Sequence, residues 1–115
     1  AAAAFIRDRL RHRPRGKARL SSELLSKGLD ADITHRVIND IFEDEGTDDL
    51  SLARQVAEGW LRRQNRDVVK ALADTAHSQS REKAHRRLYG YLTRRGFRGD
   101  ALRAAIEETI EAARN

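Results

Sequence analysis

The 115-residue sequence predicts an elongated all-α protein made of tandem three-helix bundles. Apolar residues recur three and four positions apart in nearly every segment, which is the spacing of one helix face. The chain has one proline and few runs of β-branched residues, so strands have little support. A pattern of basic helix, glycine and acidic helix also occurs twice, 68 residues apart. Such a repeat is typical of small helical units that pack against their neighbours.

The composition limits the size of the core and the range of possible functions. Charged residues make up 36% of the chain and aromatic residues 5%, so amphipathic helices around a thin core are expected. The sequence has no cysteine, which excludes disulfides, a thiol nucleophile and thiolate metal ligands. No apolar run is long enough for a membrane span, and no signal peptide is apparent.

Local signals divide the first part of the chain into three helices. Pro14 ends the first helix, because proline disfavours helical geometry in the residue before it. Gly28 ends the second as a left-handed cap, with Leu29 as its hydrophobic partner. Asp30 is a favourable N-cap for the third. The expected helices cover residues 1–12, 17–27 and 31–43.

An acidic joint at residues 43–49 separates this part from the second. The fourth helix is expected at residues 50–64, where Val56, Trp60 and neighbouring residues form an apolar stripe. Residues 65–80 are compatible with a short helix followed by a polar linker at residues 77–80. The fifth expected helix begins at about residue 81 and is ended by Gly96, with Phe97 as the hydrophobic partner of the cap. The sixth is expected at about residues 99–113.

Charge alternates along the chain in the same order as the repeat. Residues 1–28 have eight basic and two acidic side chains, and residues 29–50 have one basic and eight acidic. Residues 71–98 have seven basic and two acidic, whereas residues 99–115 have two basic and four acidic. Placing Gly28 over Gly96 superimposes the two basic helices and the two acidic helices.

Nothing in the sequence resembles a catalytic site. The four histidines are scattered, without the spacing of a metal site or a Ser–His–Asp arrangement. The acidic joint lacks the regular oxygen-ligand spacing of a calcium loop. We therefore expect a protein that is not an enzyme and has no metal or other cofactor.

The basic helices are the candidate binding surfaces, for phosphate or for an acidic protein face. Gly90 lies within the basic arc of one of them and predicts close approach by a partner, since glycine inside a helix costs about 1 kcal/mol relative to alanine. A helix–turn–helix reader of the major groove is disfavoured, because the helices after the glycine turns are acidic. Trp60, Tyr91 and Phe97 are expected in the core, and Tyr89 is left open between packing and base stacking. The candidate partner-binding residues are Arg11, Arg13, Arg15, Lys17, Arg19, Lys83, Arg86, Arg87, Gly90, Arg94 and Arg95.

Two motifs resemble the RecX family of recombinase regulators. Residues 88–97 read L-Y-G-Y-L-T-R-R-G-F, which is similar to the last three-helix unit of that family. Phe5, Arg9-Leu10, Arg13-Pro14-Arg15-Gly16, Leu20, Glu23-Leu24 and Lys27-Gly28 resemble its middle unit. The resemblance implies a middle unit at residues 1–46 and a C-terminal unit at residues 47–115, with a longer internal linker at about 65–80.

The resemblance also implies a function. RecX-like proteins are curved, modular helical proteins that bind the RecA filament on single-stranded DNA, lie in its groove and inhibit filament growth, ATPase, strand exchange and coprotease activity. A cytoplasmic monomer with RecA as its partner and no membrane contact is thus expected, with single- or double-stranded DNA as a possible direct partner. The alternative is a non-sequence-specific nucleic-acid-binding module. The chain opens with four alanines inside a predicted helix, so we expect a fragment lacking the family's upstream unit.

Overall fold

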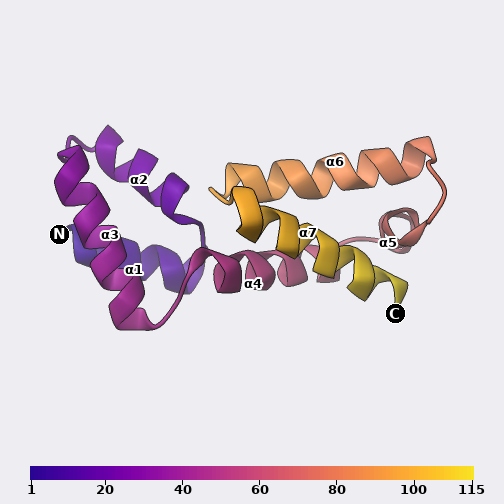
Figure 1. The fold of residues 1–115 in the computed structure, drawn as a ribbon, viewed down its shortest axis with the longest axis horizontal. Helices are drawn as coiled ribbons and strands as arrows, with labels where there is room; N and C mark the ends of the chain where they lie inside the picture. The colour runs from indigo at the N-terminus through magenta and orange to yellow at the C-terminus, as the bar shows by residue number, and fades with distance from the viewer.

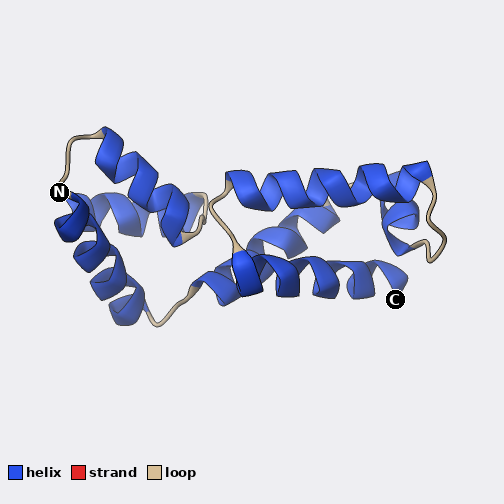
Figure 2. Cartoon of the chain, turned by 45° about the horizontal axis from the view of Figure 1, so that its top comes forward, coloured by secondary structure: helices blue, strands red, loops and turns tan.

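In the computed structural model, residues 1–115 form seven α-helices and no β-strand. The molecule measures 47 × 23 × 22 Å along its principal axes, so the prediction of an elongated all-α protein is confirmed. Figures 1 and 2 show helices α1–α3 at one end and α4–α7 at the other. The helices are α1 (Ala2–His12), α2 (Lys17–Ser26), α3 (Ala31–Glu45), α4 (Asp49–Arg62), α5 (Arg66–Ala73), α6 (Gln79–Arg94) and α7 (Gly99–Arg114).

The predicted glycine caps are present in both halves of the chain. Gly28 has φ 92°, and the N–H of Leu29 donates a hydrogen bond of 3.2 Å to the carbonyl of Leu24. Gly96 has φ 89°, and the N–H of Phe97 donates to the carbonyl of Leu92 at 3.1 Å. Positive φ and a bond that spans five residues define the Schellman cap, for which glycine is the least strained residue. The two predicted positions therefore end α2 and α6 with the same local geometry.

Several helix boundaries differ from the prediction by a few residues. Helix α3 continues to Glu45 instead of Glu43 and ends at Gly46, whose φ is 65°. The acidic joint is therefore limited to three residues, and Asp48 accepts from the N–H of Ser51 at the start of α4. Residues 66–73 form α5, and Ser78 is the N-cap of α6, so the linker between these helices lies at residues 74–78 instead of 77–80.

Each half of the molecule has its own pattern of helix packing. Helix α3 packs against α1 and α2, while α4 packs along α7, and α5 contacts both α6 and α7. In each half an arginine of the first helix pairs with carboxylates of the last: Arg7 with Asp44 at 2.6 Å, and Arg54 with Glu108 at 2.8 Å. The buried apolar side chains form one continuous cluster along the molecule, which includes Phe97 and Trp60 as expected.

The two family-like motifs lie far apart in sequence but meet in space, where they join the halves. The N–H of Gly16 donates to the carbonyl of Arg95 at 2.7 Å, and the Arg95 guanidinium donates to the carbonyl of Pro14 at 3.1 Å. The N–H of Lys17, at the start of α2, donates to the carboxylate of Asp49 at 3.0 Å. Side-chain acceptors usually satisfy such free N–H groups from within the same segment, whereas here the acceptor comes from α4. The junction is therefore held by direct hydrogen bonds between the halves.

Candidate partner-binding surface

Helix α6 presents a row of cations on its solvent side. The cations are exposed, while Leu88 and Leu92 on the other side of the helix are fully buried. The ion pairs of the chain lie elsewhere and involve none of these cations. This surface, called the α6 basic row below, consists of Lys83, Arg86, Arg87 and Arg94.

Gly90 lies within the α6 basic row, but no backbone of the chain approaches it. A Cβ on Gly90 would lie 2.9 Å from Nη1 of Arg94, and the Arg94 guanidinium accounts for every neighbouring atom. The end of an arginine side chain can move aside, so the fold itself does not require glycine at this position. The space beside Gly90 is therefore open apart from the Arg94 side chain, and contact with a partner there stays a prediction.

The predicted basic residues of the first half differ in their surroundings. Arg11 and Arg13 are exposed, whereas Lys17 is half-buried and donates from Nζ to Asn39 at 2.9 Å. Arg15 is 8% exposed, and its Nη1 donates to Glu23 at 2.7 Å. Arg15 is therefore an internal ion-pair residue and differs from the exposed contact that its position in the basic segment predicts.

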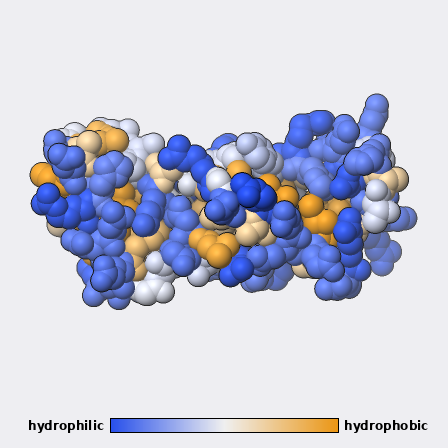
Figure 3. Space-filling view, viewed as in Figure 1, coloured by the Kyte–Doolittle hydropathy of each residue, from blue (hydrophilic) through white to orange (hydrophobic).

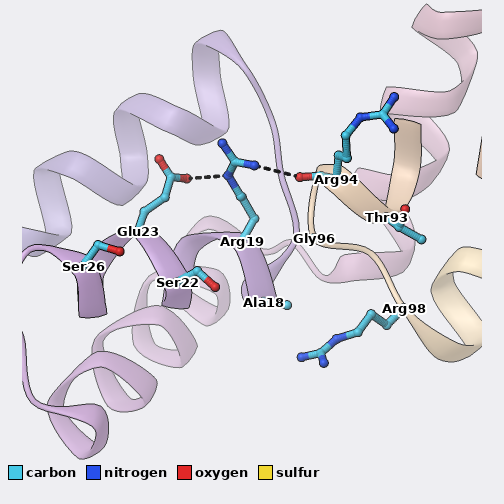
Figure 4. A pocket seen from close by; sticks show the side chains of 9 residues that line it. All are labelled: Ala18, Arg19, Ser22, Glu23, Ser26, Thr93, Arg94, Gly96 and Arg98. Atoms are coloured by element: carbon cyan, nitrogen blue, oxygen red, sulfur yellow. Dashed lines mark hydrogen bonds and ion pairs between the residues drawn. The ribbon is translucent and has the colours of Figure 1, made fainter. Parts of the chain in front are cut away.

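One face of the junction has an open cleft of about 570 Å³ between α2 and the α6–α7 turn. Figure 4 shows Arg19 between Glu23 and the carbonyl of Arg94, with the Arg94 side chain directed away. The Arg19 Nη1–carbonyl distance is 3.0 Å, and its Nε lies 3.6 Å from Glu23. The charge of Arg19 in this α2 cleft is therefore used within the chain. Its lining residues are Ala18, Arg19, Ser22, Glu23, Ser26, Thr93, Arg94, Gly96 and Arg98.

A second cleft of about 510 Å³ lies between the Pro14 corner, α4 and α6. Four of its lining residues are arginines, and none of its lining residues is acidic. Arg63 and Arg95 each donate to the hydroxyl oxygen of Tyr91 at 2.8 Å, and none of the four arginines forms an ion pair. We call this site the arginine cleft, and its lining residues are His12, Arg13, Pro14, Gln55, Val56, Gly59, Arg62, Arg63, Tyr91 and Arg95.

Arg95 lies in a locally positive and partly buried environment in the arginine cleft. Burial lowers the pKa of Arg95, and the positive charges of Arg13, Arg15 and Arg63 lower it further, whereas Tyr91 has the opposite effect. A lowered pKa means that the charged form is less favourable than in water. The cleft therefore has positive charge that no carboxylate of the chain neutralises.

Sequence reasoning identified Arg13 and Arg95 but missed Arg62, Arg63 and Gly59. Two arginines at the end of a helix are normally explained by the negative end of the helix dipole. They line one cleft only because the fold brings together segments that are about 50 and 80 residues apart in the sequence. Helical periodicity does not predict contacts of this kind. The only local signal was Gly59, a glycine in the interior of α4.

The remaining surface is mainly hydrophilic. Figure 3 shows hydrophobic residues only in small separate patches on one face. Tyr91 is half-buried, and the exposed large apolar residues are Leu25, Ile33 and Tyr89. No group of three or more histidine, aspartate or glutamate side chains is arranged to hold a metal ion. None of the seven helices combines the length and apolar character that crossing a bilayer requires.

Comparison with known proteins finds one family model that matches the beginning of the chain. Residues 1–37 match the family model of the second three-helix domain of RecX, which covers α1, α2 and the first part of α3. No curated protein and no solved structure matches the chain. The matched residues are similar to the RecX second domain and contain the motif that resembles the family's middle unit in the sequence.

Proposed function

We propose that the protein is a negative regulator of the RecA recombinase. It binds the RecA filament on single-stranded DNA, lies in the filament groove, and inhibits filament growth, ATPase, strand exchange and coprotease activity. The observation that carries this proposal is the match of residues 1–37 to the second three-helix domain of RecX. Within this proposal, residues 1–46 are the family's middle unit and residues 47–115 its C-terminal unit, and the protein acts as a cytoplasmic monomer.

The shape of the molecule supports binding to a filament. A hydrogen-bonded junction joins the two halves in a body that is 47 Å long and 23 Å wide. Such a body contacts successive subunits of a polymer through successive helical units, and linked contacts of this kind raise the overall affinity. The acidic helices α3 and α7 face protein or solvent, while the basic side faces the interior of the filament.

The proposed contact residues are the accessible members of the predicted set. They exclude Arg15, whose guanidinium is buried against Glu23. Charged rows of this kind contribute mainly to the rate and specificity of association. The proposed contacts are Arg11, Arg13, Lys17, Arg19, Lys83, Arg86, Arg87, Gly90, Arg94 and Arg95.

The test is the ATPase activity of RecA on single-stranded DNA, measured with increasing amounts of the protein. We expect the wild type to inhibit, and the R86Q/R87Q/R94Q variant to inhibit less because it lacks most of the α6 basic row. A variant with the same loss of charge at exposed positions elsewhere, R36Q/R66Q/R103Q, is the control. Circular dichroism should show equal helix content in all three proteins. Full inhibition by R86Q/R87Q/R94Q would remove the α6 basic row from the proposal, and no inhibition by the wild type would reject the proposed function.

The second candidate function is a nucleic-acid-binding module that acts without RecA. The unpaired cations of the α6 basic row and of the arginine cleft favour it, since phosphate binding needs exposed positive charge. Comparing the affinity for bare DNA with the affinity for RecA filaments separates the two functions. Tight binding to bare DNA with no gain on filaments supports the module.

A further inference from the structure

We infer that the arginine cleft at the junction binds the phosphodiester backbone of a nucleic-acid strand, with both halves of the molecule contributing cations. Arg13 comes from the first half, and Arg62, Arg63 and Arg95 come from the second. The inference deepens the proposed function and rests on it, because it assigns the contact with the strand inside the filament to a defined site.

The arginine cleft brings four unpaired arginines together in one site, whereas other arginines are either paired with carboxylates or, as in the α6 basic row, spread along an exposed helix face. Arg7, Arg15 and Arg54 each have a carboxylate within 2.8 Å, so their charge is neutralised inside the molecule. The four arginines of the cleft have no such partner, and its lining contains no acidic residue. Bringing like charges together opposes folding unless an anion offsets the repulsion. The cleft is therefore electrostatically incomplete without an anionic ligand.

The guanidinium groups also retain most of their donors. Each guanidinium has five N–H donors, and the chain provides one acceptor for Arg63 and two for Arg95. The side chains of Arg13 and Arg62 make no hydrogen bond within the chain. Arginine pairs with phosphate through two parallel N–H bonds, which also fix the geometry of the contact. The free donors therefore match the oxygen atoms of a phosphodiester.

Gly59 is buried in the lining of the cleft, next to the guanidinium groups of Arg62 and Arg63. A Cβ at Gly59 would lie 3.1 Å from Nη1 of Arg63 and 3.6 Å from Nη2 of Arg62, and no backbone atom approaches it. Glycine inside a helix costs about 1 kcal/mol relative to alanine, and packing within the chain gives no reason for that cost. The glycine leaves space in which the two guanidinium groups can lie and move.

The arrangement of charge favours a strand over a single acidic side chain. One carboxylate neutralises one of the four cations, whereas a strand has one negative charge per nucleotide. The positive charge continues beyond the cleft, because Arg87 lies eight residues before Arg95 on the same side of α6, with Tyr91 between them. Cations that extend along the helix in this way match the repeating charge of a phosphodiester backbone.

The first experiment compares the R62Q/R63Q variant with the R36Q/R103Q control, which loses the same charge outside the cleft. Binding of a labelled oligothymidylate of about 20 nucleotides is followed by fluorescence anisotropy over a series of salt concentrations. We expect R62Q/R63Q to bind on the order of tenfold more weakly, with a salt dependence reduced by about 0.7 for each lost phosphate contact. The control should bind like the wild type, and both variants should retain the helical circular dichroism signal.

Two outcomes would overturn the inference. One is equal affinity and equal salt dependence for R62Q/R63Q and the control. The other is that polyglutamate competes for the cleft as effectively as unlabelled oligonucleotide does, at the same concentration of negative charge. That result would assign the cleft to an acidic protein. RecA ATPase measurements on the same proteins keep the two proposals apart. If the wild type inhibits RecA but R62Q/R63Q binds the strand as well as the control does, only the assignment of the cleft is rejected. If strand binding depends on the cleft but the wild type does not inhibit RecA, only the RecA function is rejected.

A second measurement locates the strand directly. The chain has no cysteine, so Gln55→Cys introduces a unique attachment point for a photocrosslinker in the lining of the cleft. We expect irradiation to crosslink this protein to a bound oligonucleotide. His35→Cys on the exposed side of α3 is the control and should give little crosslinking. Equal crosslinking from the two positions would contradict the inference.

Discussion

The backbones of Gly16 and Gly96 are in direct contact at the junction of the two halves. A Cβ on Gly16 would lie 2.4 Å from the carbonyl oxygen of Gly96, and a Cβ on Gly96 would lie 2.5 Å from the backbone nitrogen of Arg19. Real Cβ atoms essentially never come this close to other atoms, so any side chain at either position would force the halves apart. The two glycines therefore determine how closely the corner at Pro14 packs against the α6–α7 turn.

Replacing Gly16 with alanine should disrupt the junction. Its φ of −76° suits any residue, so the effect is purely steric, and overpacking of this kind costs about 1–3 kcal/mol. Urea unfolding measures the loss in the free energy of unfolding. Small-angle scattering should show a radius of gyration larger than that of the wild type, whose Cα atoms have a radius of 15.7 Å.

Gly28→Ala is the matched control for this prediction. No atom lies within 4 Å of a Cβ at Gly28, but its φ of 92° strains any other residue. We expect a loss of about 1–2 kcal/mol and no change in the radius of gyration. An unchanged radius for Gly16→Ala would show that the junction tolerates a side chain there.

Arg15→Met should destabilise the protein more than Arg54→Met. The Arg15 guanidinium is buried between Glu23 and the carbonyl of Arg13, and its loss should cost about 1–3 kcal/mol because Arg19 still lies near Glu23. The pair of Arg54 with Glu108 is exposed to water, which screens it. Chemical unfolding of both variants tests the ranking, and equal losses would contradict an internal role for Arg15.

Gly90→Ala should stabilise the isolated protein by up to about 1 kcal/mol, because alanine is the better helix former and only the Arg94 guanidinium has to move. If a partner backbone lies against α6 at this position, the same variant should inhibit RecA less well. Thermal unfolding and the RecA ATPase assay are measured on one preparation. Greater stability with unchanged inhibition would show that no partner needs this space.

His85 should make the stability depend on pH. Burial lowers its pKa below the ordinary 6.5, and the charges of Arg81 and Arg114 lower it further. The unfolded chain therefore takes up the proton first, so the contribution of the neutral imidazole is present above pH 6.5 and is lost as the pH falls through the folded-state pKa. Between about pH 7.5 and about pH 5.5 the wild type should lose more unfolding free energy than His85→Gln. Parallel pH profiles for the two proteins would contradict this assignment.

Much of the fold follows from local features of the sequence. Gly28 and Gly96 end their helices, and Asp30 caps α3 with bonds to the N–H groups of Asp32 and Ile33, because these effects depend on residues within one turn. The end of α3 differs from the prediction because acidic residues 44–45 continue the helix until Gly46 ends it. The charge of these residues indicated a loop, but their helix propensity is adequate.

The candidate site could be predicted only in part. The exposure of Arg86 and Arg87 follows from the buried leucines on the other side of the helix. The burial of Arg15 does not, because its partner Glu23 is on the next helix and the corner at Pro14 had to be placed first. The arginine cleft depends on contacts between distant segments, and no helical spacing specifies which arginines meet there.

Asp49 is the first residue of α4, and its carboxylate accepts a hydrogen bond from the N–H of Lys17 at the start of α2, in the other half. If residues 1–46 were produced alone, α2 would begin without this acceptor, and Gly16 would lose its bond to Arg95. The two halves are thus expected to melt in one cooperative transition, with the shorter piece frayed at α2 when separated. Separating the halves at the loop of residues 46–48 would therefore remove hydrogen bonds on which both halves depend, although this loop has the composition of an ordinary interdomain linker.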